Sequence, residues 1–294
     1  MNRKKYKEYV YGYKLVFDGN SNTSSSTLIN INEVNSVSLT NSSYRVDFQT
    51  NQNREIYLRT TSLLETFSMP ARWLFCVEGV VSFLCNGNTQ QLYYKKELHY
   101  SDDLMRYWLI HIVLPLALTL DATYYFLHTG SVNINNKAVL FTGESYAGKS
   151  TLTDYFLQKG HALVSDDKLA TFQKDEKFYC QPSHAYHRPY RAREDLGKVC
   201  KNFNSQELEM GTLYWLEPVN ATDDISITEL KGLKKFECLR YATEMDLGVK
   251  LKERFAYLTQ LANRVKLYSI KVPRDMQRLE EVYDAIITHN TTQR

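Results

Sequence analysis

The stretch at residues 143–150 constrains this chain more than any other. It reads Gly-Glu-Ser-Tyr-Ala-Gly-Lys-Ser, which fits the G-x-x-x-x-G-K-[ST] pattern of a phosphate-binding loop. The apolar run at 138–142 precedes it, as expected of a buried strand, and residues 150–159 follow with apolar side chains at helical spacing. Gly160 is placed to end that helix. The sequence therefore predicts a strand, a glycine loop and a helix, in that order.

Each residue type in this loop has a physical use. Glycines let the backbone curl so that its N–H groups and the positive helix end together bind a polyphosphate. Lys149 would place a charge on the β- and γ-phosphates of ATP, and the Ser150 hydroxyl would bind Mg²⁺. The alternative is a coincidental glycine turn. The predicted nucleotide-binding positions are Gly143, Glu144, Ser145, Tyr146, Ala147, Gly148, Lys149, Ser150 and Thr151.

Two adjacent acids, Asp166 and Asp167, follow the next predicted strand at 161–165. A carboxylate at the end of a strand beside a phosphate-binding loop is placed to hold Mg²⁺ or to accept a proton. The alternative is a solvated Asp-Asp turn. We assign the metal to Ser150 and Asp166 and leave open which aspartate is the base.

The segment at 182–193 is the most basic loop of the chain. Arginine can pair bidentately with phosphate and with the charge of a phosphoryl group in transfer. Arg188 is the best candidate for that role. The alternative is a surface loop whose charges meet water and nearby acids.

Composition excludes several classes of protein. The net charge of +3 and the pI near 8.4 are too mild to predict binding to nucleic acid or to an anionic membrane. The start of the chain lacks the apolar core of a signal peptide, and the apolar run at 107–120 is too short to span a bilayer, so we expect a buried helix. Scattered cysteines without a C-x-x-C pair predict neither disulfides nor zinc and suit the cytoplasm. These are Cys76, Cys85, Cys180, Cys200 and Cys238.

The pattern of the chain predicts two domains. Residues 1–100 are expected to be β-rich, with strands near 13–17, 44–48, 55–58 and 80–84, a hairpin turn at 86–88, and a loop at 19–27. Residues 102–127 are expected to be mostly helical, with a kink near Pro115. Strands and helices then interleave, so residues 101–294 are predicted to form an α/β domain.

Several stretches together resemble the HPr kinase/phosphorylase superfamily. They are His128-Thr129-Gly130, the loop from 139 to 150, and the run from Lys159 to Asp167 that contains Gly-His before a strand and ends in Asp-Asp. The Lys-Ser-Thr-Leu helix start and the Pro-then-Arg loop look more like the HPr-kinase-related serine kinases, including lasso-peptide kinases. The clear match covers roughly residues 125–195.

The resemblance implies an HPr-kinase-like P-loop domain that transfers phosphate from Mg-ATP to a serine-type hydroxyl of a protein or peptide. Lys149 and Ser150 would then hold phosphates and metal, and one of Asp166 and Asp167 would be the base while the other serves Mg²⁺. His128 would lie beside the transferred phosphoryl group. Without the family, a lone histidine before a strand is more often structural.

The sequence also departs from the family. Tyr146 stands where glycine is common, Thr151 replaces an acidic residue of HPr kinase proper, and the C-terminal Arg-Gly signature has no counterpart. These departures argue against the reverse phosphorolysis and against HPr as the acceptor. An NTPase, a sugar or nucleoside kinase, and a nucleotide-sensing regulator stay open as alternatives, as does a homo-oligomer.

Overall fold

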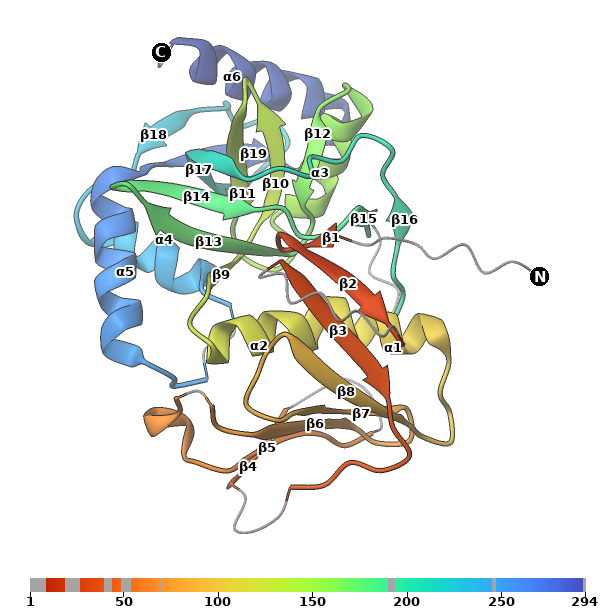
Figure 1. Cartoon of the computed structure of the whole chain (residues 1–294). Helices are drawn as coiled ribbons and strands as arrows, with labels where there is room; N and C mark the ends of the chain where they lie inside the picture. Colours follow the sequence, from red (N-terminus) through yellow and green to blue (C-terminus); the bar gives the residue numbers. More distant parts are fainter. Residues whose placement is uncertain are drawn as a thin grey trace. The chain divides into compact units, whose positions relative to one another are not determined.

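The computed structural model describes residues 9–18, 27–39, 44–48, 54–68, 70–189, 194–244 and 247–292. The chain forms two compact units (Figure 1). The first comprises Met1–Tyr124 with Arg193–Leu196 and Met245–Leu251, and the second comprises Tyr125–Ala192, Gly197–Glu244 and Lys252–Arg294. The loop expected at 19–27 lies, apart from Thr27, outside the described residues.

The first unit contains an eight-stranded sheet among its described residues, in the order β1-β2-β3-β8-β7-β6-β5-β4. Pairing is antiparallel except between β2 and β3 and between β3 and β8. A short 3₁₀ helix (Leu64–Thr66) follows β5. The strands are β1 (Tyr9–Val10), β2 (Tyr13–Phe17), β3 (Leu28–Glu33), β4 (Tyr44–Asp47), β5 (Ile56–Thr60), β6 (Trp73–Val77), β7 (Val81–Cys85) and β8 (Gln91–Lys96). The expectation of a β-rich N-terminal part agrees with this sheet, although β1, β3 and β6 were not predicted.

A long helical run follows the sheet within the first unit. It comprises α1 (Asp102–Trp108), a π-helical turn (Leu109–Val113) and α2 (Leu114–Leu120). Ser101 caps its start by accepting a hydrogen bond from the Leu104 amide at 3.2 Å. By length and composition this run could cross a membrane, with a mean hydropathy of 1.3, but 72% of that window is buried within the protein. It therefore fits the expected core helix.

The irregularity expected near Pro115 takes the form of the π-helical turn just before it. Proline has no N–H and crowds the preceding turn, so the hydrogen-bond ladder widens there. The predicted helix end at Leu127 was wrong. The helix ends at Leu120, and β9 (Tyr125–His128) follows because its residues pair with a neighbouring strand. The helical run lies in the first compact unit, whereas we expected it in the second.

The second unit is built on a mixed sheet of nine strands among its described residues, in the order β12-β10-β11-β17-β14-β13-β9, with β19 beside β17 and β18 beside β19. β11, β17 and β19 run parallel. These strands are β9, β10 (Gly130–Ile134), β11 (Lys137–Thr142), β12 (Ala162–Ser165), β13 (Lys168–Lys174), β14 (Lys177–Gln181), β17 (Leu208–Val219), β18 (Ile227–Glu229) and β19 (Lys266–Pro273). β15 (Tyr186–His187) and β16 (Lys198–Val199) form a separate pair.

Helices cover both faces of this sheet (Figure 1). The side chains of β11 alternate: Leu140 packs toward α4 and α5, whereas Val139 and Phe141 pack toward α3 and α6. The helices are α3 (Lys149–Gln158), α4 (Leu233–Ala242), α5 (Leu251–Arg264) and α6 (Leu279–Thr292), the last preceded by a 3₁₀ turn (Met276–Arg278). The second unit is therefore an α/β fold in three layers, and β11 leads directly into the predicted phosphate-binding loop at 143–150.

Candidate functional site

The phosphate-binding loop has the expected local structure. It joins β11 to α3, and Tyr146 and Gly148 have positive φ values of 65° and 97°. Gly143 also has a positive φ, and a Cβ there would lie 2.9 Å from the Leu216 carbonyl oxygen. The loop therefore needs a glycine at this point, because the backbone of β17 passes too close for a side chain.

The N-terminus of α3 is open to an anion. Gly148 occupies the N-cap position and supplies no side-chain cap, and the first turn of the helix carries no acidic residue. The first N–H groups of a helix lack partners within the helix and carry the positive end of its dipole. The geometry of the loop and of the helix N-terminus is therefore suited to binding a phosphate group.

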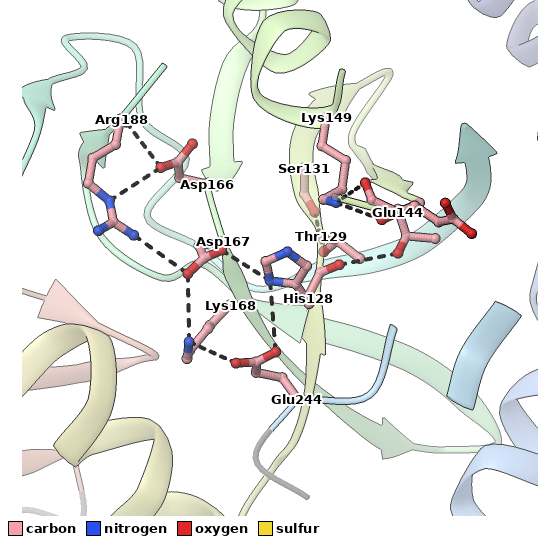
Figure 2. Close-up of polar contacts among 12 residues, drawn as sticks. His128, Thr129, Ser131, Glu144, Lys149, Asp166, Asp167, Lys168, Arg188 and Glu244 are labelled. Atoms are coloured by element: carbon pink, nitrogen blue, oxygen red, sulfur yellow. Dashed lines mark hydrogen bonds and ion pairs between the residues drawn. The ribbon is translucent and has the colours of Figure 1, made fainter. Parts of the chain in front are cut away.

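The Lys149 side chain folds across this loop (Figure 2). Its Nζ donates to the carbonyl oxygens of Gly143 at 2.6 Å and Glu144 at 3.0 Å. The ammonium group therefore lies at the mouth of the loop, where it would meet the phosphates of a nucleotide.

Strand pairing brings His128 to the acidic pair. β9 and β13 are antiparallel with Lys168 opposite His128, and the Thr129 amide donates to the Asp167 carbonyl at 3.0 Å. The Thr142 hydroxyl, at the end of β11, donates to the His128 carbonyl at 3.3 Å. The histidine is therefore tied on one side to the acidic pair and on the other to the start of the phosphate-binding loop.

Asp167 lies among a histidine, a lysine and an arginine (Figure 2). Its Oδ1 lies 3.0 Å from His128 Nδ1, and its Oδ2 lies 3.6 Å from Lys168 Nζ and 3.5 Å from Arg188 Nη2. Burial alone would raise the pKa of Asp167, but Lys168, His128 and Arg188 outweigh it and hold the pKa well below its usual value. Asp167 is therefore an ionised carboxylate at neutral pH.

Lys168 and Glu244 complete this network, and sequence reasoning missed both. Lys168 Nζ lies 2.9 Å from Glu244 Oε1, and Glu244 Oε2 lies 3.8 Å from His128 Nδ1. Burial would lower the pKa of Lys168, but Asp167 and Glu244 raise it, so the lysine stays charged. Lys168 could have been suspected from its place next to the acidic pair. Glu244 follows α4, far along the chain, and no sequence signal marks it.

Asp166 faces away from this network toward the basic loop. Its Oδ1 lies 2.6 Å from His187 Nδ1, and its Oδ2 accepts a hydrogen bond from the Arg188 amide at 3.0 Å. The Nε2 of His187 lies 3.3 Å from Asp154 Oδ1 on α3. Asp166 thus joins the basic loop to the helix of the phosphate-binding loop. The expected continuation of that loop at 190–193 lies outside the described residues.

A pocket of about 290 Å³ lies where these groups meet. Four expected residues line it together with three that were not predicted. The lining residues are His128, Ser145, Lys149, Asp167, Lys168, Tyr241 and Glu244. Asp166 and Arg188 do not line the pocket, and Arg188 reaches it through its ion pair with Asp167. Tyr146 lies at the tip of the loop with 98% of its surface exposed.

Metal binding would rest on few protein ligands. Among the residues that the structure describes, no group of three or more His, Cys, Asp or Glu side chains is arranged to hold a metal ion. Mg²⁺ usually keeps several waters and binds through one or two protein groups plus the phosphates of a nucleotide. The residues present fit that mode and do not form a cage for a metal alone.

Comparison with known proteins gave partial matches, and no family model matches the chain. Over 51 residues, or 17% of this chain, the sequence is 39% identical to the HPr kinase/phosphorylase of Lacticaseibacillus casei, and the match covers 16% of that protein. It is 43% identical over 49 residues to the HPr kinase/phosphorylase of Lactobacillus acidophilus, covering 17% of this chain and 15% of that protein. The resemblance predicted from sequence is therefore confirmed over a short segment.

One solved structure shows a weak likeness. The structure of the Hpr(Ser) kinase/phosphatase from Coxiella burnetii is matched over 57% of this chain and 97% of that chain, with 15% identity and a TM-score of 0.36. A TM-score this low does not establish a common fold.

Proposed function

Because the chain carries an HPr-kinase-like segment, we propose that it is a Mg-ATP-dependent kinase that transfers the γ-phosphoryl group to a serine-type hydroxyl of a protein or peptide. One observation carries the proposal. A single pocket is lined by the phosphate-loop residues Ser145 and Lys149 on one side and by His128 and Asp167 on the other. This arrangement supports the proposal, because the proposed phosphate-binding groups would face side chains that can exchange protons, as phosphoryl transfer to a hydroxyl requires.

The nucleotide would bind at the loop and the open N-terminus of α3. Lys149 Nζ, now on the Gly143 and Glu144 carbonyls, would turn to the β- and γ-phosphates. Ser150 and Asp166 are the proposed metal-binding residues, with Asp166 acting through water because both of its oxygens already accept hydrogen bonds. Bound Mg²⁺ would neutralise charge on the phosphates.

Transfer itself would depend on position and electrostatics. The acceptor oxygen forms a bond to the γ-phosphorus as the bond to the β-phosphate oxygen breaks, and ADP leaves with that electron pair. Lys149 would stabilise the charge on the transferring group. Arg188 would contribute by holding Asp167 in place at 3.5 Å. The proton of the acceptor hydroxyl passes to a base on the acidic side of the pocket.

Replacing Lys149 with alanine tests the phosphate-binding half of the site. The protein is incubated with Mg²⁺ and γ-³²P-labelled ATP on an array of serine-containing peptides. We expect Lys149→Ala to lower transfer by roughly 10²–10³-fold, because one preorganised charge at the transferring phosphoryl group is lost. Lys174→Ala is the control, since this lysine is exposed on β13 and pairs with Glu207.

The outcomes separate the alternatives. Label on peptide supports the proposal, and label released as free phosphate by the unaltered protein supports an NTPase. Calorimetric binding of Mg-ATP without turnover supports a nucleotide sensor. Undiminished transfer by Lys149→Ala contradicts the assignment of the phosphate-binding loop.

All five cysteines are free, so we also propose a cytoplasmic location.

A further inference from the structure

One residue of the candidate site, Tyr241, has no part in the mechanism proposed above. It lies near the end of α4 and lines the pocket of about 290 Å³, and the other six lining residues have polar or charged side chains. Tyr241 therefore supplies the one large apolar surface of this pocket among the residues that the structure describes. A single exposed aromatic side chain is ordinary on a protein surface, so it is the position in the pocket that calls for an explanation.

Packing against Trp215 holds the Tyr241 ring beside the phosphate-binding loop. The two rings meet edge to face, with centroids 4.9 Å apart and planes at 76° to each other, which is a favoured geometry for an aromatic pair. Trp215 lies on β17, in register with Thr142 at the end of β11. The tyrosine keeps 44% of its surface exposed, so the ring is fixed on one side and open on the other.

The chain that follows α4 attaches Tyr241 to the acidic side of the pocket. Thr243 forms a bridge with Leu127 of β9, the strand that ends in the histidine of the site. The Glu244 amide donates to another β9 carbonyl at 2.9 Å, and the Glu244 carboxylate lies 2.9 Å from Lys168 Nζ (Figure 2). The tyrosine is thus tied to the side of the pocket where the base of the proposed reaction lies.

This position favours contact with the acceptor. In the proposed reaction the nucleotide phosphates occupy the loop and the N-terminus of α3, so the acceptor hydroxyl must reach them past the acidic side. A peptide that brings its serine there must also bring the residue next to that serine into the neighbourhood of the Tyr241 ring. An apolar side chain gains most from such a contact, because the ring removes it from water.

We propose that Tyr241 is a specificity-determining residue that binds the acceptor, by packing its ring against an apolar side chain next to the serine that receives the phosphoryl group. This inference rests on the kinase function proposed above and names the class of acceptor. The contact is made by the ring rather than by the phenol hydroxyl. Because it is present before and during transfer, it acts on acceptor binding and leaves the chemical step unchanged.

A pair of peptides tests the inference. Both have the sequence around the serine that the unaltered protein labels most on the array, but the residues on each side of the serine are phenylalanine in one and glycine in the other. We expect the unaltered protein to prefer the phenylalanine peptide about tenfold in kcat/KM. Tyr241→Ala should remove this preference through KM, and Tyr241→Phe should keep it. Calorimetry should find the same Mg-ATP affinity in all three proteins.

The preference is measured within each protein, so it does not depend on how much of a variant is folded. Phe255→Ala is the matched control. Phe255 is an aromatic residue of α5 with 66% of its surface exposed, and it stacks on Phe236 with ring centroids 6.3 Å apart and does not line the pocket. Its removal should leave the preference unchanged.

Three results would overturn the inference. The first is an unaltered protein that labels both peptides equally well or prefers glycine, and the second is a Tyr241→Ala protein that keeps the preference for phenylalanine. The third is a fall in Mg-ATP affinity in Tyr241→Ala with the preference intact, which would assign the ring to the nucleotide. If no peptide of the array takes up label, the proposed function itself is overturned, and this inference with it.

Discussion

Asp166 and Asp167 are neighbours in sequence but lie in different environments. Successive side chains at a strand end point in opposite directions, so Asp166 meets His187 and Arg188 while Asp167 meets His128 and lines the pocket. The two residues should therefore respond differently to the same substitution.

We expect Asp166→Asn to lower both stability and transfer, because this carboxylate binds His187 and is a proposed metal ligand, and Asp167→Asn to lower mainly transfer. The first leaves the buried His187 ring without its ionised partner, which costs about 1–3 kcal/mol. The second removes the carboxylate that lines the pocket on the acidic side, where the proposed base lies, and should lower kcat by roughly 10²–10⁴-fold. Urea unfolding and kcat for both proteins measure the contrast. Equal losses of unfolding free energy and of kcat in the two variants would contradict this expectation.

Sequence reasoning predicted those candidate-site residues that belong to local patterns. The phosphate-binding loop and the acidic pair follow predicted strands, so their neighbourhood could be predicted. Lys168 and Glu244 could not be, because their positions depend on the β9–β13 register and on the path of the chain after α4. The separate environments of Asp166 and Asp167 likewise depend on groups from other segments.

At the scale of elements, the close packing of β10 against α3 holds the phosphate-binding loop. A Cβ on Gly130 would collide with Thr153 Oγ1, and that hydroxyl donates to the Lys149 carbonyl at 2.9 Å in the first turn of α3. Gly130 is thus needed for space. The quoted resemblance included this glycine, but only the structure shows what it contacts.

We expect Gly130→Ala to destabilise the protein by about 1–3 kcal/mol, because overpacking pushes α3 away from β10. Nucleotide affinity should fall with it, since the loop moves with the helix. The double variant Gly130→Ala with Thr153→Ala removes the colliding hydroxyl, and the Cβ of residue 130 would then lie 3.4 Å from the Cβ of residue 153. Most of the lost stability should therefore be regained. Thermal unfolding and Mg-ATP titration of both single variants and the double variant measure this. No recovery in the double variant would refute the packing argument.

Helices and strands were predicted correctly where the apolar residues of the sequence follow a single clear spacing. β11 and α3 were predicted from an apolar run and a helical pattern, and both were found within a residue or two. β13 and α4 were not predicted. The first four residues of β13 are all buried, so its sequence does not alternate, and α4 carries Lys234, Lys235, Glu237 and Arg240 among its ten residues. β9 was assigned to a helix because its aromatic residues continue an apolar run.

At the scale of the whole molecule, the buried His184 makes folding sensitive to acid. His184 has 4% of its surface exposed, and burial is the main cause that lowers its pKa to about 4 from the ordinary value of 6.5. Below pH 6.5 the unfolded chain binds a proton that the folded protein does not, so stability falls as the pH drops from about 6.5 to 4.

The free energy of unfolding should fall by on the order of 2 kcal/mol between pH 7 and pH 5, and urea unfolding at several pH values measures this change. Asp167 does not contribute in this window. Its pKa is lowered, so its stabilisation is present above the ordinary carboxyl value and disappears only in stronger acid. In His184→Gln the side chain cannot gain a proton, so the stability of this variant should change less between pH 7 and pH 5 than that of the unaltered protein. An unchanged slope in this variant would show that the acid sensitivity arises elsewhere in the fold.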